Sequence, residues 1–472
     1  MRHISSLLLT SLCLLSFVGY SQPKDDISFF ISKLKTNYAG FRDKAPAGEF
    51  DNFVKKVLKE DGTDTFRILS RLAHFFKDNH VILYEMNSLK YQDTLLAPGN
   101  LKKVNAYFSD SKVKKGIHEG YWLDDFNSVI VAIIRSKQQA GRYEIYLIET
   151  IYNAVPKGML IGKMEAKGGN NYFTRYISPG TGNSSFLDTK FRNDSLLVLA
   201  EHTKLRKLEN YNPANPVLPG LTPFRFVNSG RSLDKDNYLL TIPDFSYNIG
   251  SIDSIIKKDS AKIYAAKTMI LDLRNNAGGS VLAYQPLLPF IYTNPIKEVN
   301  GMILASDDLI NDYKETLEQE LNAEKLDSAS VKELQMLLPL LEKGRGGLVE
   351  TPAPPMKSGV VMALPKNVGV IINYACQSAA ELFLLNFKQS KKVTLFGENT
   401  FGAVDYLNAT FTYSPSGRYF FSIATAKRAI AAGDSKIDGT GIAPDVPISD
   451  TVKDWVDFVK KYYQNGAQKN TQ

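Results

Sequence analysis

The spacing of hydrophobic residues changes along the chain. Between residues 25 and 78, apolar residues recur every three to four positions, as in ISFFISKLKTNYAGF and TFRILSRLAHFFKD, which is typical of amphipathic helices. From about Asn100 onwards, short runs such as SVIVAIIRS and RYEIYLIET alternate or stay apolar between turn residues, which is typical of strands. We therefore predict an N-terminal helical segment over residues 22–95 and a separate β-rich domain over residues 96–215.

Both patterns occur together in residues 216–450. The strand-like runs YLLTIPDF and KTMILDL enclose a helical stretch, which predicts a strand–helix–strand unit and hence an α/β core. Leucine-spaced helix formers fill residues 305–345, and because this block separates two α/β segments, we expect it to be an insertion over the core. Residues 451–472 predict a C-terminal helix followed by a tail.

The first 21 residues differ from the rest. A short positive start precedes an apolar run over residues 4–19 and a small-residue end, which predicts a secretory signal peptide cleaved near Ser21. Leu12 precedes Cys13, where a lipoprotein signal would need a small residue, so we do not expect a lipid anchor. The expected location is the periplasm, the cell envelope or the medium of a bacterium. Cys376 would then be the single cysteine of the mature chain, as a small buried residue or as a nucleophile.

The charge and the histidines argue against two classes of function. The formal net charge of +8 comes from lysines and arginines scattered among acids, with no basic run beside stacking aromatics, so we expect no nucleic-acid partner. The five histidines form no H-E-x-x-H pair and have no cysteine pair near them, so we expect no metal site. The sequence also implies no organic cofactor, and it indicates no oligomeric state.

The stretch NYACQSAAELF allows two interpretations of Ser378. An apolar strand-like run precedes it and an apolar-periodic run follows, so Ser378 and Glu381 form the S-x-x-E pattern of a helix-capping box. A serine at such a junction can also be a nucleophile, because the helix N-terminus supplies N–H groups for a developing oxyanion. This window alone favours the cap, since such caps are common.

Other segments change that balance when they are taken together. Each has a structural interpretation: His80 in a surface turn, Asp272 and Arg274 as an ion pair, the glycines as turn residues. The segments, in chain order, are LAHFFKDNH, LDLRNNAGGS, ACQSAAE, and the pair GENTFG and KIDGTGIAPDV. All of them in one chain, in this order, are hard to explain by turn chemistry.

The motifs DNH, DLRNNAGG, SAAE, GENTFG and DGTGIAPD resemble those of the tail-specific, or C-terminal processing, serine proteases. The similarity is to the branch that includes the tricorn protease core and interphotoreceptor retinoid-binding protein. It covers residues 70–85 and about 230–450, without the helical insertion. The resemblance implies serine-peptidase activity and a crotonase-like ββα-type catalytic core within an α/β (α+β) fold.

The resemblance also implies the catalytic residues. Ser378 looks like the nucleophile and His80 like its base, with Asp438 as the carboxylate that orients the imidazole. Bacterial members with a Ser–Lys dyad carry the lysine directly after the motif that GENTFG resembles, where this chain has Ala403. A family member that uses a histidine carries glutamate in the last motif, and the side chain of Asp438 is shorter than that glutamate. If His80 were not the base, a lysine such as Lys427 or Lys436 would have to be considered.

The expected oxyanion hole uses the N–H of Ala379 and that of Gly278 or Gly279. Glycine suits this place because the backbone must approach the substrate closely. The resemblance implies a supporting role for six further residues, namely Asp272, Arg274, Glu381, Glu398, Thr400 and Gly402.

These inferences predict an exported serine peptidase that cleaves peptides or unfolded polypeptides through an acyl-enzyme, without stable membrane insertion. One alternative is a catalytically weak binding protein on the same fold, with an apolar ligand or a peptide in the cleft. Another is a hydrolase of esters or modified peptides, since a triad serves any acyl transfer. Residues 100–211 lack the glycine-rich carboxylate-binding loop of a PDZ domain, which argues against recognition of C-terminal tails.

Overall fold

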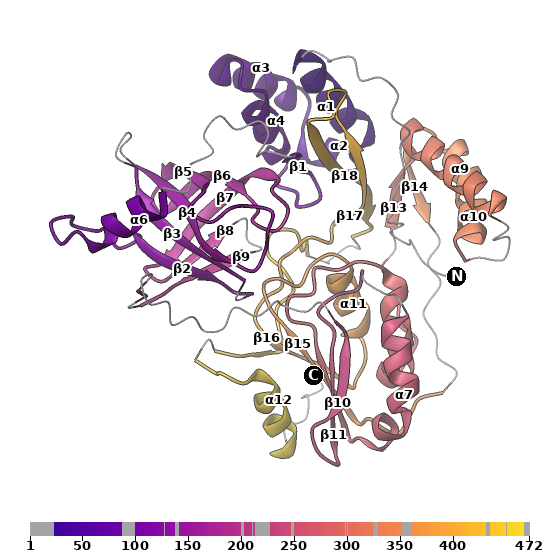
Figure 1. Cartoon of the computed structure of the whole chain (residues 1–472). Helices are drawn as coiled ribbons and strands as arrows, with labels where there is room; N and C mark the ends of the chain where they lie inside the picture. The colour runs from indigo at the N-terminus through magenta and orange to yellow at the C-terminus, as the bar shows by residue number, and fades with distance from the viewer. Residues whose placement is uncertain are drawn as a thin grey trace.

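The structure, a computed structural model, has a mixed α/β fold, as the sequence predicts. It describes residues 23–86, 100–126, 128–136, 141–199, 203–209, 211–212, 227–246, 250–297, 299, 301–323, 329–351, 360–430, 435–449 and 451–466. The predicted signal peptide lies outside these residues. Figure 1 shows two β-sheets with helices packed against them.

Four helices begin the described chain: α1 (Pro23–Asn37), α2 (Phe41–Lys44), α3 (Glu49–Asp61) and α4 (Thr65–His74). Their apolar faces meet in one buried cluster, in which the rings of Phe50 and Phe76 lie 5.1 Å apart. The Asp64 side chain accepts the Arg67 N–H and so caps the start of α4. The turn after α4 carries Asp78 and His80, and β1 (Ile82–Glu85) follows it.

The β-rich part of the chain closes on itself. Its strands are β2 (Gly120–Asp124), β3 (Val129–Arg135), β4 (Arg142–Thr150), β5 (Leu160–Gly168), β6 (Asn171–Ile177), β7 (Ser184–Asn193), β8 (Leu196–Leu199) and β9 (Thr203–Lys207). β7 pairs with both β6 and β8, which completes the closure. Helix α6 (Asn100–Ser109) packs through Val104 on the outer face, where Ile130 is also buried, whereas Val131 faces the inner core. Burial of both faces explains why β3 is apolar at successive positions.

The larger sheet continues from these strands into segments that are distant in the sequence. β1 pairs with β18 (Tyr419–Arg428) and, through Glu85, with β7. The same sheet includes β17 (Tyr406–Tyr413), β13 (Gly301–Leu304) and β14 (Leu348–Thr351). Helices α9 (Asp307–Asn322) and α10 (Ala329–Lys343) lie in the stretch expected to be a helical insertion and pack on β13 and β18 around Ile303 and Ala426.

The smaller sheet has six strands: β10 (Ser229–Ser232), β11 (Asn237–Thr241), β12 (Thr268–Asp272), β15 (Asn367–Ile372), β16 (Val393–Gly397) and β19 (Val446–Pro447). The pairs from β11 to β19 are parallel. One face is covered by α7 (Ser251–Ala265), η1 (Val281–Leu287), α8 (Leu288–Ile291) and α11 (Ala379–Phe387). The other face is covered by α12 (Trp455–Gln464), which packs through Val459.

No helix in the described ranges is long and apolar enough to cross a membrane.

Candidate active site

Three parallel strands of the smaller sheet end at one edge, and a predicted motif follows each of them. β12 ends at Asp272, β15 at Ile372 and β16 at Gly397. Because the carboxyl ends of parallel strands meet at one edge, the loops after these strands lie side by side. Figure 1 shows this edge facing the N-terminal helices and the strands β17 and β18.

Ser378 immediately precedes α11, in a conformation that non-glycine residues rarely adopt, with φ 55° and ψ −120°. Its N–H donates to Glu381 Oε2 at 3.2 Å, and its carbonyl accepts the Leu382 N–H at 2.9 Å. The bond to Glu381 is half of the capping box that the sequence predicts. Ser378 is therefore the N-cap residue of α11.

The Ser378 hydroxyl meets His80, although the two residues lie 298 positions apart in the sequence. His80 Nε2 lies 3.4 Å from Ser378 Oγ, which is a long hydrogen bond of the kind found before substrate binds. The His80 carbonyl accepts the Ser422 hydroxyl at 2.8 Å, so β18 fixes the backbone of the histidine. Burial lowers the pKa of His80, Asp78 opposes this shift and Lys44 adds to it. The neutral imidazole is the form that can accept a proton.

Asp78 is the carboxylate beside the other ring nitrogen of His80. Its Oδ1 lies 3.8 Å from His80 Nδ1 and accepts the His80 backbone N–H at 2.9 Å. Its Oδ2 accepts the Tyr38 hydroxyl at 2.5 Å and lies 3.3 Å from Lys44 Nζ. Asp78 is thus held on both oxygens while it faces the imidazole.

Asp438 lies farther from the histidine than Asp78 does, with Lys44 between the two carboxylates. Its Oδ1 accepts the N–H groups of Val404 at 2.9 Å and Asp405 at 2.8 Å, and its Oδ2 lies 3.5 Å from Lys44 Nζ. Burial and the nearby charge of Asp78 raise the pKa of Asp438 to about 6. Within the described ranges, no hydrogen bond or ion pair joins Asp438 to His80. The short aspartate side chain is already bound to backbone amides, which separates it from the imidazole.

The three residues expected to form an oxyanion hole lie around Ser378 but differ in their bonding. A Cβ on Gly278 would stand 2.9 Å from both Ser378 Cβ and the Ala379 nitrogen, so only glycine fits here. The Gly278 N–H already donates to Asn276 Oδ1 at 2.9 Å. The N–H groups of Gly279 and Ala379 donate no hydrogen bond within the described part of the chain, which leaves them available to an oxyanion.

Glu381 connects the nucleophile turn to the GENTFG segment. Besides the Ser378 N–H, its carboxylate accepts the Thr400 hydroxyl at 2.5 Å and the N–H groups of Gly402 and Ala403, both at 2.7 Å. Burial raises the pKa of Glu381 to about 7, against the effect of these bonds. Ala403, where the family's dyad lysine would stand, is therefore bound through its backbone to the helix that follows Ser378.

The other expected supporting residues have structural contacts. Arg274 donates to both oxygens of Asp272, at 2.8 and 2.7 Å, which is the ion pair that the structural interpretation predicts. Glu398 lies 3.3 Å from Lys204 of the β-rich part. Among the described residues, no hydrogen bond or ion pair joins Asp272 or Glu398 to Ser378 or His80.

Sequence reasoning missed several residues that shape the site. Asn373 accepts the Asn275 N–H at 2.9 Å and donates to the Asn275 side chain at 2.8 Å, which ties the loops after β12 and β15 together. Asn276 is fully buried, and its carbonyl accepts the Gln377 N–H at 3.1 Å. These asparagines stand inside the quoted motifs, so their position was a usable signal. Lys44 stands in no motif.

Cys376, the alternative nucleophile, and Lys427 and Lys436, the alternative bases, have contacts that do not favour these roles. Cys376 is buried, as predicted, and burial raises its pKa to about 12, so the thiol form dominates at neutral pH. Lys427 forms an ion pair with Asp43 at 2.8 Å. Lys436 lines a pocket that neither Ser378 nor His80 lines.

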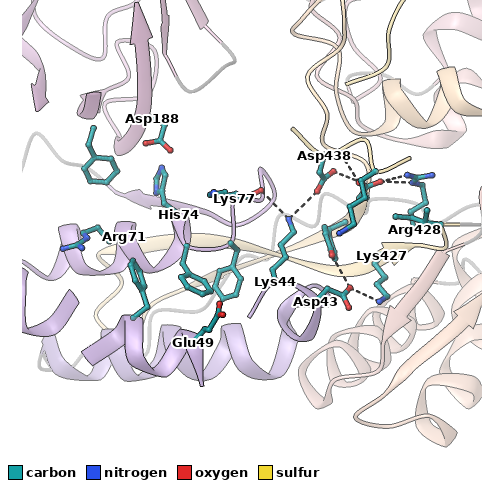
Figure 2. A pocket seen from close by; sticks show the side chains of 18 of the residues that line it. Asp43, Lys44, Glu49, Arg71, His74, Lys77, Asp188, Lys427, Arg428 and Asp438 are labelled. Carbon is teal, nitrogen blue, oxygen red and sulfur yellow. Dashed lines mark hydrogen bonds and ion pairs between the residues drawn. The ribbon is translucent and has the colours of Figure 1, made fainter. Parts of the chain in front are cut away.

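That pocket, with a volume of about 1320 Å³, adjoins the carboxylates on the side of the N-terminal helices. Figure 2 shows Lys44 and Asp438 pointing toward each other in its wall, with the Asp43–Lys427 pair beside them. Lys44 lines this pocket, whereas Ser378 and His80 do not.

Residues 238–448 match the family model described as peptidase family S41. Among solved structures, mature CPAF is similar to this chain at 14% identity, covering 90% of this chain and 92% of that chain with a TM-score of 0.48. The photosystem II D1 C-terminal processing protease is similar at 14% identity, covering 91% and 93% of the two chains with a TM-score of 0.38. A comparison with curated proteins gives no match.

Proposed function

Because the chain belongs to peptidase family S41, a family of serine peptidases, we propose that it cleaves peptides or unfolded polypeptides with Ser378 as the nucleophile. The observation that carries this proposal is the 3.4 Å contact between Ser378 Oγ and His80 Nε2 at a strained helix start. A serine hydroxyl is a weak nucleophile until a neighbouring base takes its proton.

In the acylation step, Ser378 Oγ attacks the peptide carbonyl carbon while its proton passes to His80 Nε2. The Gly279 and Ala379 N–H groups donate hydrogen bonds to the oxyanion that forms. The C–N bond then breaks, and the leaving amine takes the proton from His80, which leaves an ester on Ser378. In deacylation, water attacks the ester carbon and gives a proton to His80. The bond between that carbon and Ser378 Oγ then breaks, Oγ takes the proton back from His80, and the carboxylic acid leaves.

The third member of the triad is assigned to Asp78, with Asp438 as a second carboxylate behind it. Asp78 lies 3.8 Å from His80 Nδ1, so a small side-chain rotation brings its oxygen into hydrogen-bond range. A carboxylate there keeps the proton on Nδ1 and leaves Nε2 free to accept the proton of Ser378. Asp438, the residue that the family resemblance implies, would act on His80 through Lys44 and Asp78.

The expected working environment is the bacterial periplasm, envelope or medium. The predicted signal peptide over residues 1–21 supports export.

The test compares the chain from Gln22 onwards with a Ser378→Ala variant. Both are incubated with casein and a mixed peptide pool, and the products are identified by mass spectrometry. We expect cleavage by the native chain alone, with equal thermal stability of the two proteins. Cleavage by neither would favour a binding protein on this fold, and hydrolysis of esters without peptides would favour an esterase. Equal cleavage by both would contradict the assignment of Ser378.

A further inference from the structure

Lys44 occupies the space between the two carboxylates near the histidine. Its Nζ lies 3.3 Å from Asp78 Oδ2 and 3.5 Å from Asp438 Oδ2, and it donates to the Lys77 carbonyl at 3.4 Å. The ammonium also lies 4.3 Å from the centre of the Tyr406 ring. Figure 2 shows the side chain extending across the pocket wall toward Asp438.

The negative charges of Asp78 and Asp438 need a cation near them. The Asp78 side chain is 1% exposed and that of Asp438 is 14% exposed, so both carboxylates are poorly hydrated. Two buried carboxylates at short range repel, and one of them tends to take up a proton. A single ammonium between them removes most of that repulsion. Lys44 is the cation that contacts both carboxylates among the described residues.

We propose that Lys44 is a positioning residue of the hydrolytic site, which offsets the negative charge of Asp78 and Asp438 and holds Asp78 against His80. This inference rests on the proposed role of His80 as the base. The chain of contacts is short: Lys44 and Tyr38 hold Oδ2 of Asp78, and Oδ1 of the same carboxylate faces the imidazole. Lys44 has no contact with Ser378 or His80 within hydrogen-bond range, so it acts through Asp78.

Several other charged or titratable groups face this cluster and have to be considered in any pH experiment. Asp43 of α2 accepts the Tyr406 hydroxyl at 3.2 Å and pairs with Lys427 of β18. Asp405 pairs with Arg428 and accepts the Asp438 N–H at 3.0 Å. These acids already have cationic partners of their own, so removal of Lys44 exposes the uncompensated charge of Asp78 and Asp438.

The experiment compares Lys44→Met and Lys44→Arg with Lys427→Met as a matched control. The side chains of Lys44 and Lys427 are both 19% exposed and line the same pocket, but Lys427 pairs with Asp43 instead of the carboxylates near His80. The first readout is the NMR titration of His80 in histidine-labelled protein, with the signal assigned by a His80→Ala variant. The second is the pH dependence of kcat/KM on a cleaved peptide.

Lys44 lowers the pKa of His80, and its removal leaves Asp78 beside the imidazole without that compensating charge. A proton taken up by the carboxylate pair goes to Asp438, because burial and the charge of Asp78 already raise the pKa of Asp438. We therefore expect Lys44→Met to raise the pKa of His80, to move the acid limb of kcat/KM to higher pH with it, and to lower kcat at least tenfold. Lys44→Arg should restore most of the native profile. Lys427→Met, which removes the partner of Asp43 and of neither carboxylate near His80, should shift the profile less than Lys44→Met does.

Two outcomes separate the failure of this inference from the failure of the proposed function. A His80 titration in Lys44→Met that matches the native protein would overturn the role of Lys44, whether or not peptides are cleaved. If the His80 titration shifts in Lys44→Met but neither the native protein nor the variant cleaves any peptide, the role of Lys44 is supported and the peptidase function is contradicted. If Lys44→Met does not fold, Lys44→Gln takes its place in both readouts.

Discussion

At the scale of single residues, the site depends on which carboxylate faces the imidazole. Asp78 stands two positions before His80 and lies 3.8 Å from Nδ1, whereas Asp438 is bound to the Val404 and Asp405 amides. A carboxylate that orients a catalytic histidine sets its tautomer, and replacement by an amide produces the wrong one. The two aspartates should therefore differ in how strongly they affect turnover.

We expect Asp78→Asn to lower kcat by about 10³-fold or more, and Asp438→Asn to lower it by roughly tenfold, since the asparagine carbonyl can still accept the two amides. Peptide hydrolysis measured on both variants at the same pH checks this order. The reverse order would restore Asp438 as the orienting acid. Equal losses of about 10³-fold would mean that the two carboxylates act as one unit.

The sequence could not predict which of the two aspartates faces His80. The family motifs pointed to Ser378, His80 and Asp438, and the D-x-H pattern already contained Asp78. Whether Asp78 or Asp438 meets the imidazole depends on how the last motif folds against Val404, which is a tertiary contact. Lys44 stands in a four-residue helix without a motif, so no local signal marked it.

At the scale of elements, the turn between β15 and α11 has to fit closely against the loop after β12. Gly278 has φ 94°, and a Cβ on it would stand 2.8 Å from the Gln377 carbonyl and 2.9 Å from Ser378 Cβ. Helix α11 adds a second constraint, because Glu381 on its first turn binds the backbone of Gly402 and Ala403. Both contacts fix the position of Ser378, because the turn that carries it is packed against Gly278 on one side and bonded to Gly402 and Ala403 through Glu381 on the other.

The Gly278→Ala variant should lose at least 10²-fold in kcat/KM, because a 1 Å misplacement of reacting groups has an effect of this size. The control is Gly417→Ala: Gly417 also has a positive φ, 69°, but nothing lies within 4 Å of a Cβ there. Both variants should be destabilised by about 1–2 kcal/mol through backbone strain alone. Activity and thermal unfolding are measured on both, and a native-like activity of Gly278→Ala would contradict the close packing against Ser378.

The Glu381→Gln variant should reduce the pH dependence of stability. Burial raises the pKa of Glu381 to about 7, above the value of about 4.3 for an exposed glutamate. Between these values the folded protein keeps a proton that the unfolded chain has released, so the free energy of unfolding falls as the pH rises. Urea denaturation at pH 5 and pH 7.5 should show a smaller fall in the variant, by at least about 1 kcal/mol. An unchanged fall would mean that Glu381 stays ionised throughout.

The elements themselves were largely predictable from periodicity. The helices up to residue 78 and the strands that precede each motif follow from apolar spacing, because burial of one face or of both faces leaves a local pattern. The pairing of β1 with β18 does not leave such a pattern, since its partners are far apart in the chain. That pairing places His80 beside Ser378. Sequence patterns therefore indicated that His80 is a site residue, but they could not show that it contacts Ser378.

At the scale of the whole molecule, the β-rich part contacts the loop that leads to the nucleophile. The Tyr374 hydroxyl donates to Asp125, between β2 and β3, and Lys204 Nζ of β9 lies 3.4 Å from the centre of the Tyr374 ring. Lys204 also lies 3.3 Å from Glu398, after β16. Tyr374 stands four positions before Ser378, so these contacts connect the β-rich part to the nucleophile turn.

We expect Tyr374→Phe and Asp125→Ala each to lower kcat/KM by roughly three- to thirtyfold, and the double variant to lose no more than either single one, since both remove the same bond. Tyr152→Phe, at an exposed tyrosine of the β-rich part, should have no effect. Steady-state kinetics on the four variants gives the coupling. Additive losses would mean that the two residues act independently, and no loss would mean that the contact does not position the turn.

The central claim is that His80 activates Ser378, and covalent labelling with a fluorophosphonate tests it most directly, because the reagent needs an activated serine and no knowledge of the substrate. The labelled site is identified by mass spectrometry, and the labelling rate is compared between the native protein and His80→Ala. We predict a single adduct on Ser378, formed about 10³-fold faster in the native protein. An adduct on another serine, or an equal rate in His80→Ala, would contradict the account.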